Sequence, residues 1–439
     1  MVTVAMAAAV GMSAFRFVQL DPGHFHAALV QKLAYPVGEV SPDVRVYAPK
    51  GPELDGHISL VKAFGIRADS PARWNEIVYA GPDWLSAFEV ETPARRRLGG
   101  DEIAILAGRN DRKAEYALAA VRCGCHVLAD KPLVIGAEGY AKLEAAVAAA
   151  KSGRRAFADM MTLRHSVRQR VLAALSQDAE LTGGLRKGTA DEPAVVRSSV
   201  HHFLKNVNGS PLRRPAWYYD VSRQGLAIVD VTTHLVDAVQ WSLFPGEALS
   251  KGDVEMLAAR VWPTVVPAAD YEASTGVAAP GPVSVEANGS FAYRLRGIAI
   301  GVSVEWRVTA SPGGGDCEHA EFRGEKATVG LRQAPEDGFE AVVFVRPAAG
   351  EDAAALRTRL DRAVARLSKR WPGLGVAEDR DGGWKVVMPE GLETSHEEQF
   401  NRVARDFISW ARDGEPEREY ANLLVKYHTL VSARAKAGR

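Results

Sequence analysis

Residues 103–133 read IAILAGRNDRKAEYALAAVRCGCHVLADKPL, and this stretch decides the fold. Ile103–Ala107 is an apolar run typical of a buried strand, and a polar turn follows at Gly108–Asp111. Arg112–Arg122 has the apolar spacing of a helix, and His126–Ala129 is a second short strand. Strand, helix and strand of these lengths predict one repeating unit of a parallel, doubly wound α/β sheet.

The same alternation extends toward the N-terminus. Phe15–Leu20 and Val44–Tyr47 are predicted strands, and His26–Ala34 is a predicted helix between them. On the C-terminal side, Ala137–Lys151 is a predicted helix that Gly153 ends. We therefore expect a Rossmann NAD(P)-binding domain over residues 15–153.

The first residues have a different composition. Residues 1–14 are apolar and Ala-rich, but they lack the basic segment that begins a secretory signal. We expect a disordered N-terminal extension there.

After about residue 154 the alternation stops. Val195–Leu204, Ser284–Leu295, Ile298–Thr309 and Ala341–Val345 are predicted strands without a helix between each pair. They predict an α+β domain over 154–395 with a large open, mainly antiparallel sheet.

The remaining segments complete this second part. Pro263–Pro282 and Ser311–Gly315 are predicted surface loops, and Asp352–Arg370 is a predicted amphipathic helix. We expect residues 396–439 to be a helical segment that packs back on the Rossmann domain.

Composition excludes several classes of partner. The chain has 54 basic and 54 acidic residues, so no charge excess favours nucleic acid or an anionic membrane. No segment is apolar for long enough to predict a membrane span. Three cysteines exclude a disulfide-built fold, so we expect a reducing, cytoplasmic location.

The turn after the first strand is the expected place for a dinucleotide. It reads Asp21-Pro22-Gly23-His24-Phe25-His26, and only Gly23 remains of the three glycines typical of that turn. Gly23 and the helix start behind it can still hold an anion. His24 and His26 are candidates for contact with phosphate or substrate. Because these two histidines lack a nearby acidic partner, we expect no metal site.

The second strand should end near an acid that binds the adenosine ribose. Here it runs into Ala48-Pro49-Lys50. Lys50 would favour the 2′-phosphate of NADP, whereas Asp55 would favour the ribose of NAD. The choice between NAD and NADP stays open.

Two later segments carry the strongest chemical signals. Asp130-Lys131-Pro132 follows a predicted strand, where a lysine can donate to a substrate hydroxyl. Asp230, His234 and Asp237 are spaced to share one face of a helix that is otherwise apolar. Two acids and a histidine on a buried face are costly unless paired, and functional sites tolerate that cost more often.

These segments resemble the Gfo/Idh/MocA family, named for glucose–fructose oxidoreductase, inositol dehydrogenase and rhizopine catabolism. Asp130-Lys131-Pro132 is similar to its Glu-Lys-Pro signature, with Asp in place of Glu. Asp230 and His234 are similar to its later D-x-x-x-H helix, with Asp237 trailing. Glu115–Leu133 is similar to the helix and strand before the lysine. The resemblance covers most of residues 15–245.

The resemblance implies oxidation of a hydroxyl on a sugar, glycoside or cyclitol by hydride transfer to NAD or NADP. Lys131 would polarise the hydroxyl, His234 would take its proton, and Asp230 would orient the sugar. It also implies a homo-oligomer, dimer or tetramer.

Further residues are assigned to the two ligands. Those predicted to bind the cofactor are Gly23, His24, Phe25, His26, Asn110, Asp130 and Lys131. Those predicted to bind the substrate are Lys131, Lys205, Trp217, Tyr219, Asp230 and His234, because aromatic rings stack on sugars and Lys donates to hydroxyls. Packing between domains is the alternative for Lys205, Trp217 and Tyr219.

The sequence leaves two other functions open. A redox-neutral enzyme that keeps NAD bound and cleaves glycosides would need the same Lys131 and His234. A non-catalytic sensor of sugar or cofactor would use the same fold.

Overall fold

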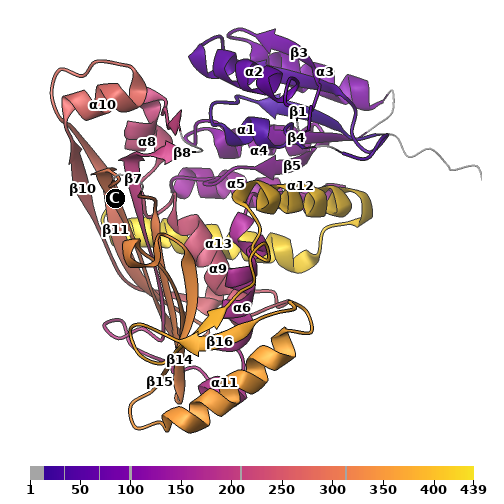
Figure 1. Cartoon of the computed structure of the whole chain (residues 1–439). Helices are drawn as coiled ribbons and strands as arrows, with labels where there is room; N and C mark the ends of the chain where they lie inside the picture. Colours follow the sequence, from indigo (N-terminus) through magenta and orange to yellow (C-terminus); the bar gives the residue numbers. More distant parts are fainter. Residues whose placement is uncertain (1–13, 34, 69, 98–100, 208–209, 312–313) are drawn as a thin grey trace, which may run out of the picture.

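The computed structural model describes residues 14–439, apart from 34, 69, 98–100, 208–209 and 312–313. The predicted extension over 1–14 therefore lies outside the described residues except for Ala14. Two sheets dominate the structure, and helices lie between and around them (Figure 1). Among the described residues, no helix is both long and apolar enough to span a membrane.

The first sheet has six parallel strands in the order β3-β2-β1-β4-β5-β6. The strands are β1 (Arg16–Leu20), β2 (Asp43–Ala48), β3 (Asn75–Ala80), β4 (Glu102–Leu106), β5 (His126–Ala129) and β6 (Phe157–Asp159). The strand order reverses between β1 and β4. Ligands bind outside the carboxyl ends of the strands at such a point. The predicted doubly wound sheet is confirmed.

Helices cover both faces of this sheet. They are α1 (His26–Leu29), α2 (Pro52–Phe64), α3 (Trp84–Arg96), α4 (Lys113–Arg122) and α5 (Ala137–Gly153). Successive residues of a strand face opposite sides, so Val18 belongs to the same buried cluster as Phe88 of α3, while Phe17 belongs to the cluster that contains Leu54 of α2.

The predicted helix over His26–Ala34 was wrong in length. It ends at Leu29 because tertiary contacts engage the next residues. The carbonyl of Gln31 accepts a hydrogen bond from Trp74, and its side chain accepts one from Gln19.

The second sheet has nine strands in the order β10-β11-β12-β7-β13-β14-β15-β17-β16. These are β7 (Val195–Leu204), β10 (Val254–Val266), β11 (Val283–Leu295), β12 (Ile298–Thr309), β13 (Cys317–Arg323), β14 (Ala327–Gln333), β15 (Ala341–Pro347), β16 (Gly375–Glu378) and β17 (Trp384–Val387). Among the described strands of this second sheet, only the pairing of β12 with β7 is parallel. The expected large, mainly antiparallel sheet is confirmed. A separate two-stranded ladder joins β8 (Asn206–Val207) and β9 (Ser210–Pro211).

The predicted loop over Pro263–Pro282 was wrong. Strand β10 continues to Val266, and helix α10 (Ala268–Thr275) follows. Pro263 lies where the register with β11 shifts, between Trp262 and Thr264. A bulge accommodates a residue that cannot donate to the ladder, so this proline does not end the strand.

Helices pack on the second sheet from the side of the first. They are α6 (Val167–Ser176), α7 (Ala179–Thr182), α8 (Val221–Gln224), α9 (Thr232–Leu243) and α11 (Ala353–Leu367), with short turns η1 (Thr162–His165), η2 (Ala216–Tyr219), η3 (Lys251–Asp253) and η4 (Pro335–Asp337). The apolar side chains of α9 and of the sheet, such as Val236 and Ile300, belong to one core.

The tail forms two helices, α12 (His396–Asp413) and α13 (Glu417–Lys436). Gly414, whose φ of +99° is incompatible with a right-handed helix, ends α12. Phe400 and Phe407 of α12 pack in the same cluster as Phe17 of the first sheet. Helix α13 lies between the two sheets and contacts α5, α9 and β10 (Figure 1). The tail therefore joins both parts of the chain, while the domain boundaries at 153 and 395 stay predictions.

Candidate active site at the carboxyl edge of the first sheet

The loops after β1, β4 and β5 meet at one edge of the first sheet, because these three neighbouring strands are parallel. The backbone N–H groups of Gly23 and His24 both donate to the carbonyl of Ala107, at 3.0 and 2.9 Å. This edge collects most of the residues that the sequence predicts for the cofactor.

The loop after β4 needs a glycine at position 108. A Cβ on Gly108 would lie 1.9 Å from the carbonyl oxygen of Asp21, which real side chains do not tolerate. A Cβ on Gly23 would lie 3.5 Å from the side chain of Glu53, an ordinary contact. Close backbone packing therefore requires Gly108, which the sequence analysis missed. Its signal is a glycine directly after a buried strand.

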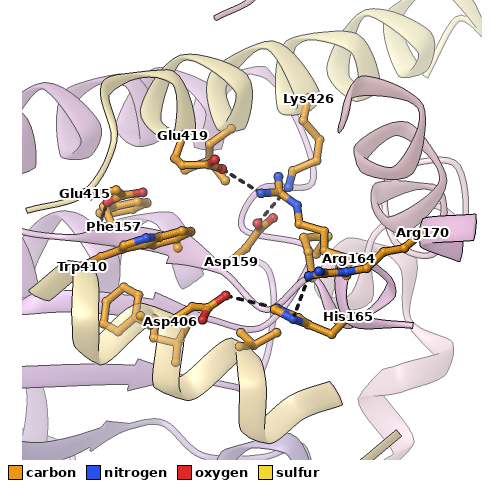
Figure 2. Close-up of a pocket in the computed structure, with 16 residues that line it drawn as sticks. Phe157, Asp159, Arg164, His165, Arg170, Asp406, Trp410, Glu415, Glu419 and Lys426 are labelled. Carbon is orange, nitrogen blue, oxygen red and sulfur yellow. Dashed lines mark hydrogen bonds and ion pairs between the residues drawn. The ribbon is translucent and has the colours of Figure 1, made fainter. Parts of the chain in front are cut away.

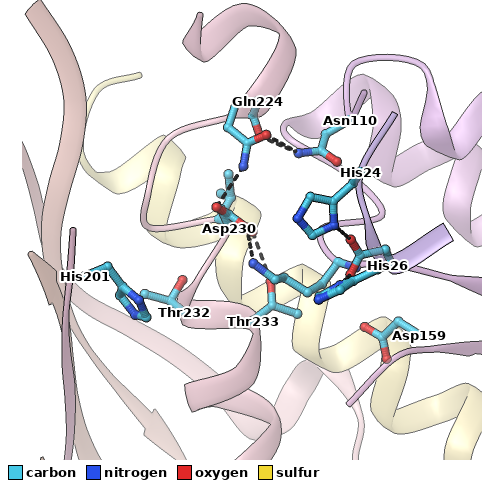
Figure 3. Close-up of polar contacts among 12 residues, drawn as sticks. His24, His26, Asn110, Asp159, His201, Gln224, Asp230, Thr232 and Thr233 are labelled. Carbon is cyan, nitrogen blue, oxygen red and sulfur yellow. Dashed lines mark hydrogen bonds and ion pairs between the residues drawn. The ribbon is translucent and has the colours of Figure 1, made fainter. Parts of the chain in front are cut away.

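Lys131 and Asp230 form the central ion pair. Lys131 Nζ donates to Asp230 Oδ1 at 2.6 Å, and Gln224 Nε2 donates to Asp230 Oδ2 at 2.8 Å (Figure 3). The exposed fractions of the side chains are 16% for Lys131 and 5% for Asp230. Asp230 lies in the turn before α9, not on the helix face that the spacing predicts. Both carboxylate oxygens are therefore engaged, and the lysine remains partly accessible.

A buried chain of hydrogen bonds supports this pair. Asn110 Nδ2 donates to the carbonyl and the side chain of Gln224, at 2.8 and 3.1 Å. Lys113 Nζ donates to Asn110 Oδ1 and to the carbonyl of Asp130. Burial lowers the pKa of Lys113 to about 8. Asn110 was predicted to bind cofactor, but its amide is used to tie the β4 loop to α8. Gln224 and Lys113 were not predicted.

His234 lies in the first turn of α9. Burial lowers the pKa of His234 well below 6.5, and the positive charge of Lys131 is the next largest cause of this decrease. His26 lowers the pKa further, whereas the charge of Asp130 raises it. Its Nδ1 atom is buried and has no hydrogen-bond partner among the described residues. Burial and the nearby charge of Lys131 therefore favour the neutral form of His234, whose Nδ1 is free to interact with a ligand.

Asp237 does not join this site. Arg164 binds it with two hydrogen bonds of 2.8 and 2.7 Å, and Lys426 of α13 donates to it at 2.9 Å. Burial opposes ionisation, yet Arg164 and Lys426 hold the pKa of Asp237 well below its usual value. Lys426 also donates to Asp159. Asp159, Arg164 and Lys426 border a cavity next to Phe157 and Trp410, away from Lys131 and Asp230 (Figure 2).

His24, His26 and Asp130 form a cluster beside Lys131. His24 Nδ1 lies 2.9 Å from Asp130 Oδ2, and His26 Nδ1 lies 3.0 Å from Asp130 Oδ1 (Figure 3). Burial, then His26, lowers the pKa of His24 to about 4. Burial would raise the pKa of Asp130, but His26 and His24 hold it well below its usual value. The fold thus supplies the acidic partner that the sequence analysis did not find.

The other predicted residues lie in different surroundings. Phe25 is a half-exposed ring at the same edge, 39% accessible. Lys205 pairs with Asp316, which also lies 2.8 Å from His201 Nδ1. Trp217 is buried, and its Nε1 has no hydrogen-bond partner among the described residues. Tyr219 stacks on Phe203 and donates to Ser274 at 2.6 Å, which favours packing over substrate contact.

A carboxylate lies beside the glycine turn after all. Glu53, in the first turn of α2, packs its side chain against Gly23. The pKa of Asp21 is raised mainly by burial, and the negative charge of Glu53 raises it further. Lys50 and Asp55, between which the sequence analysis could not choose, are both exposed. Glu53 was missed because the expected position is the end of the strand itself.

Comparison with known proteins identifies the family and the fold. Residues 171–438, more than half of the chain, match the family model described as "Putative oxidoreductase C terminal domain". The crystal structure of a "putative oxidoreductase" from Parabacteroides merdae is 37% identical, with 98% of each chain covered and a TM-score of 0.92. No curated protein matches in sequence.

More distant structures share the fold. GenD2 from gentamicin A biosynthesis, crystallised with NAD, is 16% identical with a TM-score of 0.57 and covers 100% of this chain and 98% of its own. KijD10, a 3-ketoreductase from Actinomadura kijaniata crystallised with NADP and TDP-benzene, is 16% identical with a TM-score of 0.56, covering 96% and 97%.

Fold and site together define an oxidoreductase of the Gfo/Idh/MocA type, and the predicted resemblance is confirmed. Within that class, the chain belongs to the family defined by the oxidoreductase C-terminal domain.

Proposed function

We propose that this protein oxidises a hydroxyl of a sugar, glycoside or cyclitol by hydride transfer to NAD or NADP. The observation that carries the proposal is the Lys131–Asp230 pair at the carboxyl edge of the first sheet. A partly accessible ammonium group, a neutral buried histidine and a carboxylate there provide a donor, a base and an orienting group. GenD2 and KijD10, which have this fold, were crystallised with NAD and NADP, in keeping with the proposal.

The residues present fit a dinucleotide at this edge. The β1 and β4 loops pack closely through Gly108, an exposed Phe25 lies beside them, and Glu53 supplies a carboxylate for the ribose. Gly23, His24, Phe25 and Lys131 would hold the cofactor there. When bound, its nicotinamide would accept the hydride, which is the chemistry that the protein itself lacks.

The side chains would act in sequence on the substrate hydroxyl. Lys131 Nζ donates a hydrogen bond to the hydroxyl oxygen, which makes loss of the hydroxyl proton easier. His234 takes that proton at a ring nitrogen. Asp230, held by Gln224, keeps Lys131 in place and accepts from a neighbouring hydroxyl. Positioning by the Asn110–Gln224 chain lowers the entropic cost of bringing these groups together.

Trp217 is the predicted aromatic residue with an unused donor. Its indole N–H is buried and unpartnered among the described residues, so we propose that it donates to a sugar hydroxyl. Lys205 is available for a ligand only if it leaves Asp316, and Tyr219 has its hydroxyl engaged with Ser274. A homo-oligomer and a cytoplasmic location remain predictions.

The test begins with cofactor content. The freshly purified protein is denatured, and its supernatant is examined for nucleotides by mass spectrometry. The protein is then screened with NAD or NADP against sugars, glycosides and cyclitols for net cofactor reduction. Net reduction supports the proposal. Stoichiometric bound NAD(H) with glycoside cleavage but no net reduction supports the redox-neutral alternative. A protein that binds neither dinucleotide refutes both.

A further inference from the structure

His24, His26 and Asp130 form a donor set that takes no part in the proposed proton and hydride transfer, although His24 is also among the residues proposed to hold the cofactor. Its three donor atoms, one from each residue, all lie within 4.8 Å of one another. The histidines follow β1 and Asp130 follows β5, so the cluster lies at the carboxyl edge of the sheet, next to Lys131. We propose that these three residues bind a divalent transition-metal ion, with Zn²⁺ as the best fit.

The spacing of the donors is close to that of a coordination shell. Zn²⁺ binds imidazole nitrogen and carboxylate oxygen at about 2.0–2.2 Å, which in a tetrahedron separates neighbouring donors by about 3.3–3.6 Å. The two Nδ1 atoms lie 2.9 and 3.0 Å from the two oxygens of Asp130. Although His24 Nδ1 is this close, it is buried and makes no hydrogen bond of normal geometry. The three donors therefore lie close enough together to surround one ion after a small rearrangement.

The chemistry of the donors selects the ion. Two imidazoles and one carboxylate suit Zn²⁺ and related transition ions better than Mg²⁺ or Ca²⁺, which prefer all-oxygen sites. Three protein ligands leave at least one coordination position open for water or a ligand oxygen, as in catalytic rather than structural zinc sites.

The charges around the cluster permit a cation. Lys131 directs its ammonium group to Asp230, and Lys113 donates to Asn110 and to the backbone of Asp130. Arg109 is paired with Asp21 at 3.1 Å. The exposed fractions of the side chains are 24% for His24, 13% for His26 and 5% for Asp130, so the two histidines lie near the surface.

The test uses the full chain without dinucleotide or sugar, so its result does not depend on the proposed function. Protein freed of metal with a chelator is titrated with Zn²⁺ in competition with a chromogenic chelator. Wild type should bind one Zn²⁺ per chain. His24→Gln and His26→Gln, which keep a polar group near Asp130, should each weaken binding by at least about tenfold. His319→Gln, a partly exposed histidine on β13, is the matched control and should bind as wild type.

A second readout guards against unfolded variants. Co²⁺ added to the metal-free wild type should give visible ligand-field absorption, and circular dichroism should show each variant folded. Wild type that binds no stoichiometric Zn²⁺ would overturn the proposal. So would folded His24→Gln and His26→Gln variants that bind Zn²⁺ as tightly as His319→Gln.

Discussion

Lys131 Nζ lies 2.6 Å from Asp230 Oδ1, although the two residues are 99 positions apart. The lysine follows a strand of the first sheet, and the aspartate precedes a helix that packs on the second sheet. The ion pair therefore spans the two parts of the chain. Gln224 and Asn110 extend the same connection through hydrogen bonds. A ligand that contacts both residues would bind between the two sheets.

Replacing Lys131 with Ala should lower kcat/KM by about 10²–10⁴-fold, because it removes the donor to the substrate hydroxyl. Steady-state rates with the best substrate from the screen provide the measurement. Lys142→Ala, which removes an exposed lysine paired with Glu138, is the control and should be neutral. A folded Lys131→Ala protein with wild-type activity would contradict the proposed role.

Gly108→Ala should destabilise the protein by about 1–3 kcal/mol and weaken dinucleotide binding, because the new Cβ meets the carbonyl of Asp21 at 1.9 Å. Gly23→Ala should have little effect on stability, since its Cβ finds ordinary space. Urea unfolding and calorimetric titration with NAD measure the two effects. The reverse ranking of the variants would show that Gly23 is the packed position.

Glu53→Gln should raise the affinity for NADP relative to NAD by about tenfold, or about 1.4 kcal/mol, because it removes a negative charge near the 2′-phosphate. Asp55→Asn, at an exposed position in the same helix, should leave the ratio unchanged. Titration of each variant with both dinucleotides gives the ratio. If only Asp55→Asn changes it, Asp55 is the ribose ligand.

Asp237→Ala should destabilise the fold by about 3–5 kcal/mol, because it leaves Arg164 and the fully buried Lys426 without a shared partner. Glu138→Ala, which breaks an exposed pair with Lys142, should cost at most about 1 kcal/mol. Urea denaturation of both variants checks this. Equal losses of unfolding free energy in the two variants would mean that the buried ion pairs of Asp237 stabilise the fold no more than an exposed pair does.

Glu415 should make stability depend on pH. Burial raises the pKa of Glu415 from 4.5 to about 8, so between these values the folded state holds a proton that the unfolded state has lost. Stability therefore falls as pH rises from 4.5 to about 8, by at most about 1.4 kcal/mol per unit. Glu415→Gln should flatten this slope, whereas exposed Glu390→Gln should not. Urea midpoints across this range give the slopes. An unchanged slope in Glu415→Gln would exclude Glu415 as its source.

The local sequence pattern was sufficient to predict the bounds of strands in which a single periodicity of apolar residues dominates. The strands at His126–Ala129, Val195–Leu204 and Ile298–Thr309 have the predicted bounds. Helix α3 and strand β3 were not predicted, because Pro93 lies inside the helix and the strand is only half-buried. For these elements, tertiary packing outweighs a weak local signal.

Sequence by itself determined the fold class and the family resemblance, and it singled out Lys131, Asp230 and His234 as candidate site residues, because those signals are short and local. Only the tertiary structure decided which charges share a site. It placed Asp130 between His24 and His26 and moved Asp237 into a separate buried cluster. The physical reason is that partners such as Asp237 and Lys426, 189 positions apart, are chosen by how the sheets and helices pack. Spacing along one helix carries no information about that choice.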